Sequence, residues 1–304
     1  MRCPRGTCFL LVGRIFLSGT LLGQVGRSLH TLQHKPSEIG LRELSSALIG
    51  WSPQQIRDFP ALRTLQAVGS QDELPIILDG AGQTAAAAYQ EFPRISCDEA
   101  LTSEIGSPPK AKHQKFRYMV FPGRVGDVDA MEEYRTDPER NLPEQLNLRD
   151  LFMISSGFAS TLMYFGPDQR RDSHFRDFGT QWIRNRKCHV VGFAQDPERA
   201  RNVGEVRIGG KDATVYLQGL AWIDSQSFQT LRLMIWPLPS CMDLDLSSMN
   251  ATIDFYPVQP IGSKTVLWLP RYVKVRVLYR GTTVRNIHHY SNFKLFRVDS
   301  KVKP

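Results

Sequence analysis

Two adjacent histidines, His288 and His289, precede Tyr290 and form the polar cluster most suggestive of chemistry. Imidazole nitrogens bind metals and transfer protons near neutral pH. The cluster lies in a predicted strand, where neighbouring side chains point to opposite faces, so the two rings cannot hold one metal ion together. Each ring is interpreted as a single surface or half-buried histidine rather than as a ligand or base.

A second cluster places His174 between Asp172 and Asp177, a combination that would suit a metal site or proton transfer. Arginines crowd the same stretch, so ion pairing in a solvated loop explains these residue types. The arginines are Arg170, Arg171 and Arg176.

Serine and carboxylate chemistry find little support. Ser155 is followed by Ser156 and Gly157, which is not the G-x-S-x-G pattern of a nucleophile elbow, so no serine nucleophile is predicted. Carboxylates at 243, 245 and 254 lack the glycine-bearing loop of defined ligands that a calcium site requires. We therefore predict no catalytic residue, no metal and no cofactor.

Residues 80–85 fit the G-x-G-x-x-[GA] fingerprint of dinucleotide-binding folds, with Asp98 or Glu99 at about the right distance for a ribose contact. A strand at 75–78 and a helix at 85–90 would complete the pattern. However, Pro93 stops the helix early, and no strand-helix alternation follows. A glycine-capped loop before a short helix explains the residues, and a nucleotide-dependent enzyme is kept as a remote alternative.

Met1 to Gly23 contains two early arginines and an apolar run of signal-peptide length. We expect residues 1–26 to be a signal peptide, with a retained anchor as the alternative, and a periplasmic or secreted protein peripheral to the membrane. The net charge is +8, and the three arginines at 2, 5 and 14 leave +5 from Gln24 onward. Basic residues are dispersed among strands and turns, so no nucleic-acid partner is expected.

The expected mature chain holds Cys97, Cys188 and Cys241. One disulfide with one free thiol, or three buried thiols, are both compatible with this number. No spacing matches a redox or zinc motif.

The elements that must position these residues follow from periodicity. Residues 27–92 predict an N-terminal helical extension, including a short helix that Ser52 and Pro53 open. Residues 93–300 predict one antiparallel domain that begins with a three-strand meander at 95–105, 116–121 and 131–136, with an exposed loop at 107–114. Later strands bring the total to about ten.

The stretch from Ala213 to Trp236 predicts a hairpin that turns at 224–227. One face carries residues such as Leu217 and Ile223, and the other carries Leu220 and Trp222, so both faces are apolar. Something must cover the second face, either a helix or a bound apolar molecule.

Residues 158–165 have helical spacing and end at Gly166 and Pro167, which predicts a short apolar helix inserted between strands. We expect this helix to cover the second face of the hairpin. Core packing is the ordinary role of such a helix, and the ligand-lining alternative places five residues around one cavity. They are Phe158, Leu162, Phe165, Trp222 and Met234.

The order of elements, with GLAWIDSQSFQTLRL at 219–233, NATIDFYPV at 250–258 and LWLPRYVKVRVLYRGTTVRN at 267–286, resembles the half-barrel of LolA and RseB type periplasmic proteins. The C-terminal half, ending in HHYSNFKLFRV, is similar to uncharacterised secreted acidobacterial proteins. The resemblance implies an α+β, mostly antiparallel fold, in which a curved half-barrel sheet encloses an apolar cavity, plugged by helices, that accepts acyl chains.

The sequence thus predicts a non-enzymatic cell-envelope protein that binds a lipid or another apolar small molecule. The alternative is a protein-interaction or sensor module, with an envelope protein as partner, in which a helix permanently fills the half-barrel.

Overall fold

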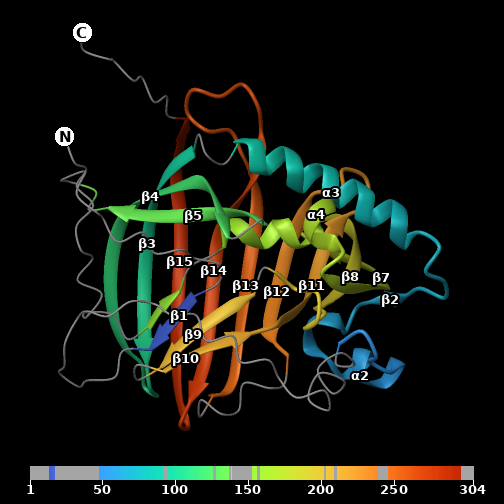
Figure 1. Ribbon diagram of the computed structural model, residues 1–304, viewed down its shortest axis with the longest axis horizontal. Coiled ribbons are helices and arrows are strands. Elements are labelled where there is room, and N and C mark those ends of the chain that lie inside the picture. The colour runs from blue at the N-terminus through green and yellow to red at the C-terminus, as the bar shows by residue number, and fades with distance from the viewer. Residues whose placement is uncertain are drawn as a thin grey trace.

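The computed structural model describes residues 14–17, 48–91, 95–125, 128–136, 138, 153–155, 158–201, 203–208, 211–238 and 246–295. Its main feature is an eleven-stranded sheet in which every neighbouring pair is antiparallel (Figure 1). The strands, in spatial order, are β2 (Gln66–Ala67), β7 (Ser173–Ile183), β8 (Arg186–Gln195), β11 (Leu217–Asp224), β12 (Thr230–Pro237), β13 (Leu246–Val258), β14 (Leu267–Tyr279), β15 (Thr282–Leu295), β3 (Ile95–Ile105), β4 (Lys110–Val125) and β5 (Val128–Thr136).

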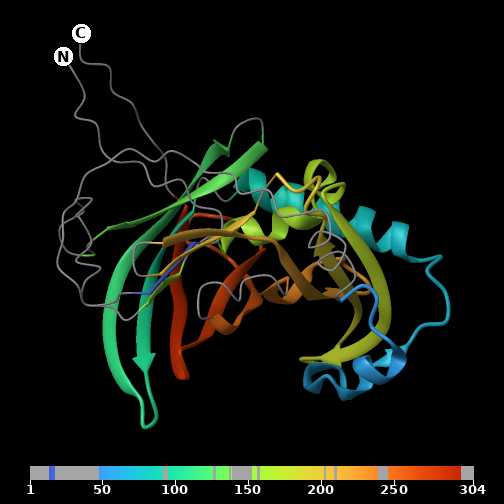
Figure 2. The same cartoon turned by 60° about the horizontal axis from the view of Figure 1, so that its bottom comes forward.

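Figure 2 shows this sheet curving into an open half-barrel. A smaller sheet has the order β10 (Lys211–Val215), β9 (Gly204–Ile208), β1 (Arg14–Leu17) and β6 (Met153–Ser155). Within it β1 runs parallel to β9 and antiparallel to β6. β1 falls inside the residues that the sequence predicts to be a signal peptide.

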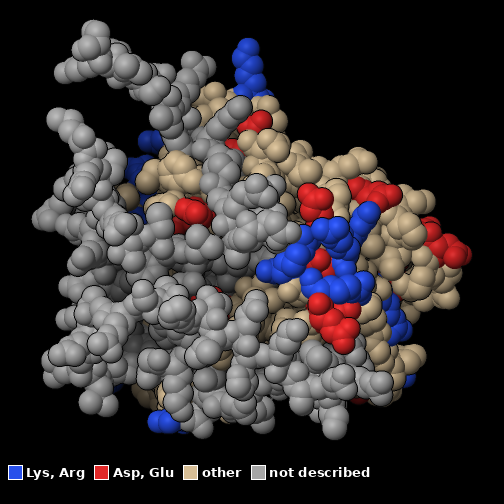
Figure 3. Space-filling model, viewed as in Figure 1, with Lys and Arg blue, Asp and Glu red and all other residues tan. Residues whose placement is uncertain are grey.

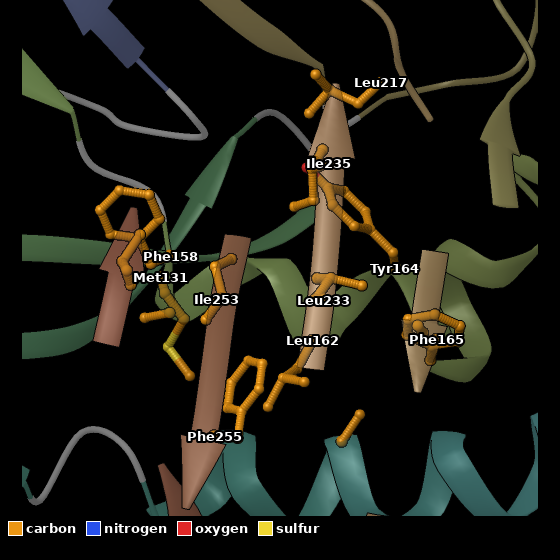
Figure 4. Packing of buried hydrophobic residues seen from close by; sticks show 14 of the residues in the cluster. Met131, Phe158, Leu162, Tyr164, Phe165, Leu217, Leu233, Ile235, Ile253 and Phe255 are labelled. Carbon is orange, nitrogen blue, oxygen red and sulfur yellow. The ribbon is translucent and has the colours of Figure 1, made fainter. Parts of the chain in front are cut away.

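The inner face of the main sheet packs against two helical segments, α3 (Leu74–Glu91) and the 3-10 helix η4 (Ala159–Phe165), followed by the short α4 (Pro167–Arg170). Strand alternation places Leu233, Ile253 and Val275 on this face, where they share one apolar cluster with η4. Figure 4 shows Leu162 and Phe165 among the side chains of this cluster. The main core therefore lies between the sheet and its helical cover.

The outer face carries a second apolar cluster over β7, β8, β11 and β12. The N-terminal helices α2 (Pro53–Asp58) and η1 (Pro60–Leu62) cover it. Ser52 begins α2 with a capping box, in which its hydroxyl accepts from Gln55 N and Gln55 Oε1 accepts from Ser52 N. Trp51 extends the contact by stacking on Trp236, with ring centroids 6.2 Å apart.

The predicted fold class is confirmed: the sheet is antiparallel, curved and crossed by an inserted helical segment. The short helix predicted to open at Ser52 and Pro53 is present as α2, whereas residues 27–47 of the predicted helical extension lie outside the described residues. The predicted loop at 107–114 is wrong in part, because the turn ends at Pro109 and β4 begins at Lys110. The prediction of a solvated loop around His174 is also wrong, since β7 begins at Ser173.

The inserted segment covers the face opposite to the one predicted. Tyr164 stacks on Phe193 of β8, with ring centroids 5.3 Å apart, and η4 belongs to the cluster of Leu217 and Ile223. The face of Leu220 and Trp222 is covered by the N-terminal helices instead. Both hairpin faces are apolar as expected, but two different chain segments bury them.

None of the helices in the described part of the chain is long and apolar enough to cross a membrane.

Candidate functional site

The candidate site is a small apolar cavity on the inner face, where β14, β15, β3 and β4 meet the start of η4. Its volume is about 20 Å³, roughly the space for one water molecule. It is too small in this conformation to hold an alkyl chain. The lining residues are apolar or aromatic: Ile95, Cys97, Tyr118, Val120, Phe158, Ala159, Pro270, Tyr290 and Phe293.

β5 holds the start of η4 in place beside this cavity. Glu133 Oε1 accepts a hydrogen bond from Ala159 N at 2.9 Å. Ser160 Oγ accepts from Met131 N at 3.3 Å. Because buried backbone N–H groups need partners, the first bond satisfies an N–H in the first turn of η4 and the second satisfies one of β5. Together they fix the start of η4 against β5. Figure 4 shows Phe158 and Met131 among the side chains of the inner cluster.

A fully buried polar cluster lies behind the cavity wall, centred on the carboxylate of Glu99 in β3. Arg135 of β5 donates to both oxygens, from Nε to Oε2 at 2.5 Å and from Nη2 to Oε1 at 2.9 Å. Tyr290 donates its hydroxyl to Oε1 at 3.1 Å. His288 Nδ1 lies 2.6 Å from the same oxygen. A buried charge needs such pairing, and both oxygens of Glu99 are satisfied.

The other side of His288 faces the small sheet. Its Nε2 lies 2.8 Å from Ser155 Oγ in β6. Asn286 Nδ2 donates to Ser155 Oγ at 3.1 Å and to Met153 O at 3.0 Å. A continuous chain of hydrogen bonds therefore runs from Asn286 through Ser155 and His288 to Glu99.

Burial and neighbouring charges set the protonation states in this cluster. Burial alone would raise the pKa of Glu99, but Arg135 and the hydrogen bonds from His288 and Arg135 outweigh it and lower that pKa to about 2. Burial lowers the pKa of His288 below its ordinary value despite Glu99. At neutral pH, Glu99 is ionised and His288 is neutral. The proton on His288 is assigned to Nδ1, because Glu99 is an acceptor there, which leaves Nε2 to accept from Ser155.

Two glycines of α3 allow this helix to pack closely on its neighbours. A Cβ built on Gly80 of α3 would lie 2.3 Å from Phe228 Cγ, and one on Gly82 would lie 2.9 Å from Phe165 O. Thr84 Oγ1 donates to Phe228 O at 3.0 Å. Small residues thus let α3 approach the hairpin turn and η4 closely.

The same glycines were the basis of the dinucleotide fingerprint, and this interpretation is wrong. Residues 75–78 are not a strand, because α3 is one continuous helix from Leu74 to Glu91. The fingerprint requires a strand, a tight glycine turn and then a helix, so that amide groups at the helix start meet a pyrophosphate. Here the pattern lies inside the helix, where Gly82 faces the interior.

The structure does not bring the five predicted cavity residues together. Phe158, Leu162 and Phe165 belong to the inner cluster, and Phe158 alone of the five lines the cavity. Trp222 and Met234 belong to the outer cluster. The separation follows from strand alternation, because Trp222 and Met234 point away from η4. A role of any of them in binding a ligand stays a prediction.

Trp222 has a polar partner on the outer face. Its Nε1 donates to Gln181 Oε1 at 2.8 Å, and Gln181 Nε2 donates to Ala61 O and Thr64 Oγ1. These bonds join β11, β7 and the N-terminal helical segment. Trp222 therefore ties the N-terminal segment to the sheet.

The opposite orientations of His288 and His289 were predicted correctly, but the complete burial of His288 was not. His288 is buried and His289 only partly, on opposite faces of β15. The partners Glu99, Arg135 and Ser155 come from three other strands, and nothing in the sequence pattern pairs them. The only sequence signal was an alternation that turned His288 toward the same face as Val284 and Tyr290.

The other candidates do not form a site. His174 contacts Asp196 at 3.3 Å, while Asp172 pairs with Arg201. Around α4, where Figure 3 shows interspersed basic and acidic side chains, Arg170 also pairs with Asp79. No group of His, Cys, Asp or Glu within the described residues could hold a metal ion.

Cys97 and Cys188 are free buried thiols in different clusters, and Cys241 and the carboxylates at 243 and 245 lie outside the described residues. Asp254 pairs with Arg232. Asp224 accepts from Ser227 N and Gln226 N, as expected of a turn residue.

No protein-family model matches this chain, and no curated protein does. Solved structures do. A DUF1329 family protein from Desulfovibrio piger has a TM-score of 0.39 and 13% identity, over 73% of this chain and 95% of its own. A putative outer membrane lipoprotein-sorting protein domain from Vibrio parahaemolyticus has a TM-score of 0.40 and 10% identity, over 74% and 94%.

A LolA superfamily protein from Nitrosomonas europaea has a TM-score of 0.35 and 10% identity, over 72% of this chain and 94% of its own. The type of protein that the sequence resembles thus recurs among the similar structures. All three TM-scores lie below 0.5, so no ligand, activity or partner carries over from these proteins.

Proposed function

We propose that this chain is an exported cell-envelope protein that binds an acyl chain or another extended apolar ligand between the inner face of the main sheet and its cover, α3 and η4. The observation that carries the proposal is the apolar cavity under Phe158, at the edge of the inner cluster. In this proposal one end of the ligand occupies the cavity, and the rest of the ligand lies between the main sheet and its cover.

The character of the cavity wall selects the ligand. The nine lining residues carry no charge, and the carboxylate of Glu99 behind them is already bonded by Arg135 and Tyr290. A hydrocarbon end of a ligand gains about 0.8 kcal/mol for each buried methylene. A charged headgroup would find no partner at this wall, so the part of the ligand that enters must be uncharged.

The cover must move for a long chain to enter, because the cavity holds only about 20 Å³. Large side chains, Ile77 and Leu78, anchor the first half of α3, whereas its middle contacts the core through the small residues Ala81, Gly82 and Ala85. Small side chains bury little area each, so separating them from the core costs less than separating large ones. We propose that α3 lifts and that ligand replaces its contacts.

A disulfide between α3 and the hairpin turn tests this directly. A Cβ on Gly80 would lie 2.3 Å from Phe228 Cγ, which is one bond from Phe228 Cβ. One further bond puts the two Cβ atoms at most about 3.8 Å apart, which is within the reach of a disulfide. In the Gly80→Cys/Phe228→Cys variant, with Cys3, Cys8 and Cys241 replaced by serine, oxidation should lock α3 onto the sheet.

The readout is titration with a fluorescent long-chain fatty acid. The reduced variant should bind it, and the oxidised variant should bind at least about tenfold more weakly, while reduction restores binding. The Phe228→Cys single variant, which keeps Gly80 and cannot form the lock, is the matched control. Equal binding by the oxidised and reduced forms would show that the ligand does not enter under α3.

The small cavity also favours a second candidate, a protein-interaction module whose half-barrel is permanently filled by its own helices. Native mass spectrometry of the protein purified from membranes separates the two. A stoichiometric lipid supports ligand binding. An empty protein that also fails to bind the fatty acid in its reduced, unlocked form supports the interaction module.

A further inference from the structure

We propose that Ser155, His288 and Glu99 form an acyl-transfer site, with Ser155 as nucleophile, that acts on esters of the apolar chain received by the neighbouring cavity. This inference goes beyond binding and rests on the same cavity as the proposed function. The substrate class is an ester of an extended alkyl acid.

The geometry is that of a nucleophile, a base and a group that orients the base. Ser155 Oγ lies 2.8 Å from His288 Nε2, and His288 Nδ1 lies 2.6 Å from Glu99 Oε1. The three residues come from β6, β15 and β3, so the tertiary fold alone assembles them. Such a triad is recognised by the roles of its members and not by their order in the chain.

The state of each group suits its role. Glu99 is ionised, and Arg135 and Tyr290 hold both of its oxygens in place. His288 is neutral, with Nε2 directed at the serine hydroxyl. A neutral imidazole can accept the serine proton, and the adjacent carboxylate stabilises the imidazolium that results.

Asn286 holds the nucleophile in position. Its Nδ2 donates to Ser155 Oγ at 3.1 Å and to Met153 O at 3.0 Å, so both amide hydrogens are bonded within β6. Because the oxyanion forms on the carbonyl oxygen of the ester and not on Ser155 Oγ, these bonds orient the serine and do not stabilise the tetrahedral intermediate. We assign a positioning role to Asn286.

Access to Ser155 is closed in this conformation, since the residue is 1% exposed. Phe158 lies between the cavity and the cluster of Ser155 and His288. It lines the cavity, and its ring lies against the ring of His288, with centroids 5.0 Å apart. Rotation of the Phe158 ring would connect the cavity with His288 and Ser155. A chain that displaces Phe158 would therefore bring its ester to the serine.

The reaction balances with water as the co-reactant. Ser155 Oγ bonds to the ester carbonyl carbon as its proton passes to His288 Nε2. The bond from that carbon to the alcohol oxygen then breaks, and His288 returns the proton to the departing oxygen. Water hydrolyses the acyl-serine by the same route, which releases the acid and restores the Ser155 hydroxyl.

The test is covalent labelling of the full chain with a long-chain alkyl fluorophosphonate, read by intact mass and by tandem mass spectrometry. We expect one adduct, located on Ser155. Phe158→Ala should be labelled faster, because the ring no longer separates the cavity from the serine. A folded wild type and a folded Phe158→Ala that both remain unlabelled on Ser155 would overturn the proposal.

Variants identify the mechanism. Ser155→Ala should lose the adduct, and His288→Gln should slow labelling by at least about 100-fold. Ser103→Ala is the matched control, since Ser103 is as fully buried as Ser155 but its Oγ bonds no histidine among the described residues. It should be labelled like the wild type. If Ser155→Ala fails to fold, the site of the adduct in the wild type still decides.

Different experiments test the proposed binding function and the proposed acyl-transfer reaction, so either proposal can fail without the other. Fatty-acid titration measures binding without any ester, and turnover of a long-chain p-nitrophenyl ester measures the reaction. Binding without an adduct or turnover would leave the proposed function intact and remove this inference. Labelling of Ser155 without measurable fatty-acid binding would remove the proposed function and keep a serine site.

Discussion

The ring of Phe158 lies against the imidazole of His288, with centroids 5.0 Å apart and an interplanar angle of 67°. One side of this aromatic pair belongs to an apolar cavity, and the other belongs to a fully buried polar cluster. Phe158 thus separates the part of the molecule suited to hydrocarbon from the part suited to proton transfer. The predictions below address the contacts on each side of this boundary.

Trp222→Phe should destabilise the protein without changing affinity for an apolar ligand. The substitution removes the hydrogen bond from Nε1 to Gln181 Oε1, and leaving that buried amide oxygen without a donor costs about 1–3 kcal/mol. Trp222 lies in the outer cluster, away from the cavity. Urea unfolding measures the first effect and fatty-acid titration the second. A weakened affinity with normal folding would place the ligand on the outer face instead.

Glu99→Gln should cost at least about 3 kcal/mol of unfolding free energy, because it leaves the buried Arg135 guanidinium without its counter-ion. Arg135→Met should cost a similar amount for the opposite reason. The double variant should be more stable than the sum of the single losses predicts. Denaturant unfolding in a double-mutant cycle measures the coupling, and purely additive losses would contradict a direct ion pair.

Stability should fall as the pH falls below neutral. Burial lowers the pKa of His288 from 6.5, so the unfolded state takes up its proton first, and stability is lost below about pH 6.5. Glu99 has a folded pKa of about 2 against 4.5, so its contribution is fully present above pH 4.5 and is lost toward pH 2. Around His288, the charged groups that set this behaviour are Glu99, Arg135 and Glu133.

His288→Gln separates the two parts of that pH profile. It should flatten the unfolding free energy between about pH 6.5 and 5 relative to the wild type, while the loss below pH 4.5 remains. Chemical denaturation at several pH values measures both. An unchanged slope between pH 6.5 and 5 would show that His288 titrates normally in the folded protein.

Gly82→Ala should destabilise the cover, because the new Cβ would lie 2.9 Å from the backbone oxygen of Phe165. A rigid carbonyl cannot move aside as a side chain can, so α3 must shift at a cost of about 1–3 kcal/mol. Gly69→Ala is the matched control, since nothing lies within 4 Å of its Cβ position. Thermal unfolding should distinguish the two variants, and equal stabilities would mean that α3 is loosely seated.

The sequence by itself determined the periodic features. Alternation predicted the antiparallel sheet, the two apolar faces of the hairpin and the opposite orientations of His288 and His289, because strand period is a local property of the backbone. Gly166 and Pro167 likewise predicted where the inserted segment ends. Local steric rules suffice for each of these features.

Tertiary structure alone decided which segments meet. It assigned η4 to the inner face and the N-terminal helices to the outer face, although both segments are apolar. It also placed the glycines of the fingerprint inside helix α3, where they permit close packing against Phe228 and Phe165. The sequence could not separate these two roles, because a nucleotide-binding turn and a close helix contact both require glycine. The tertiary structure also placed Glu99 beside His288, 189 residues apart, because partners across a sheet are set by strand order, which no local pattern encodes.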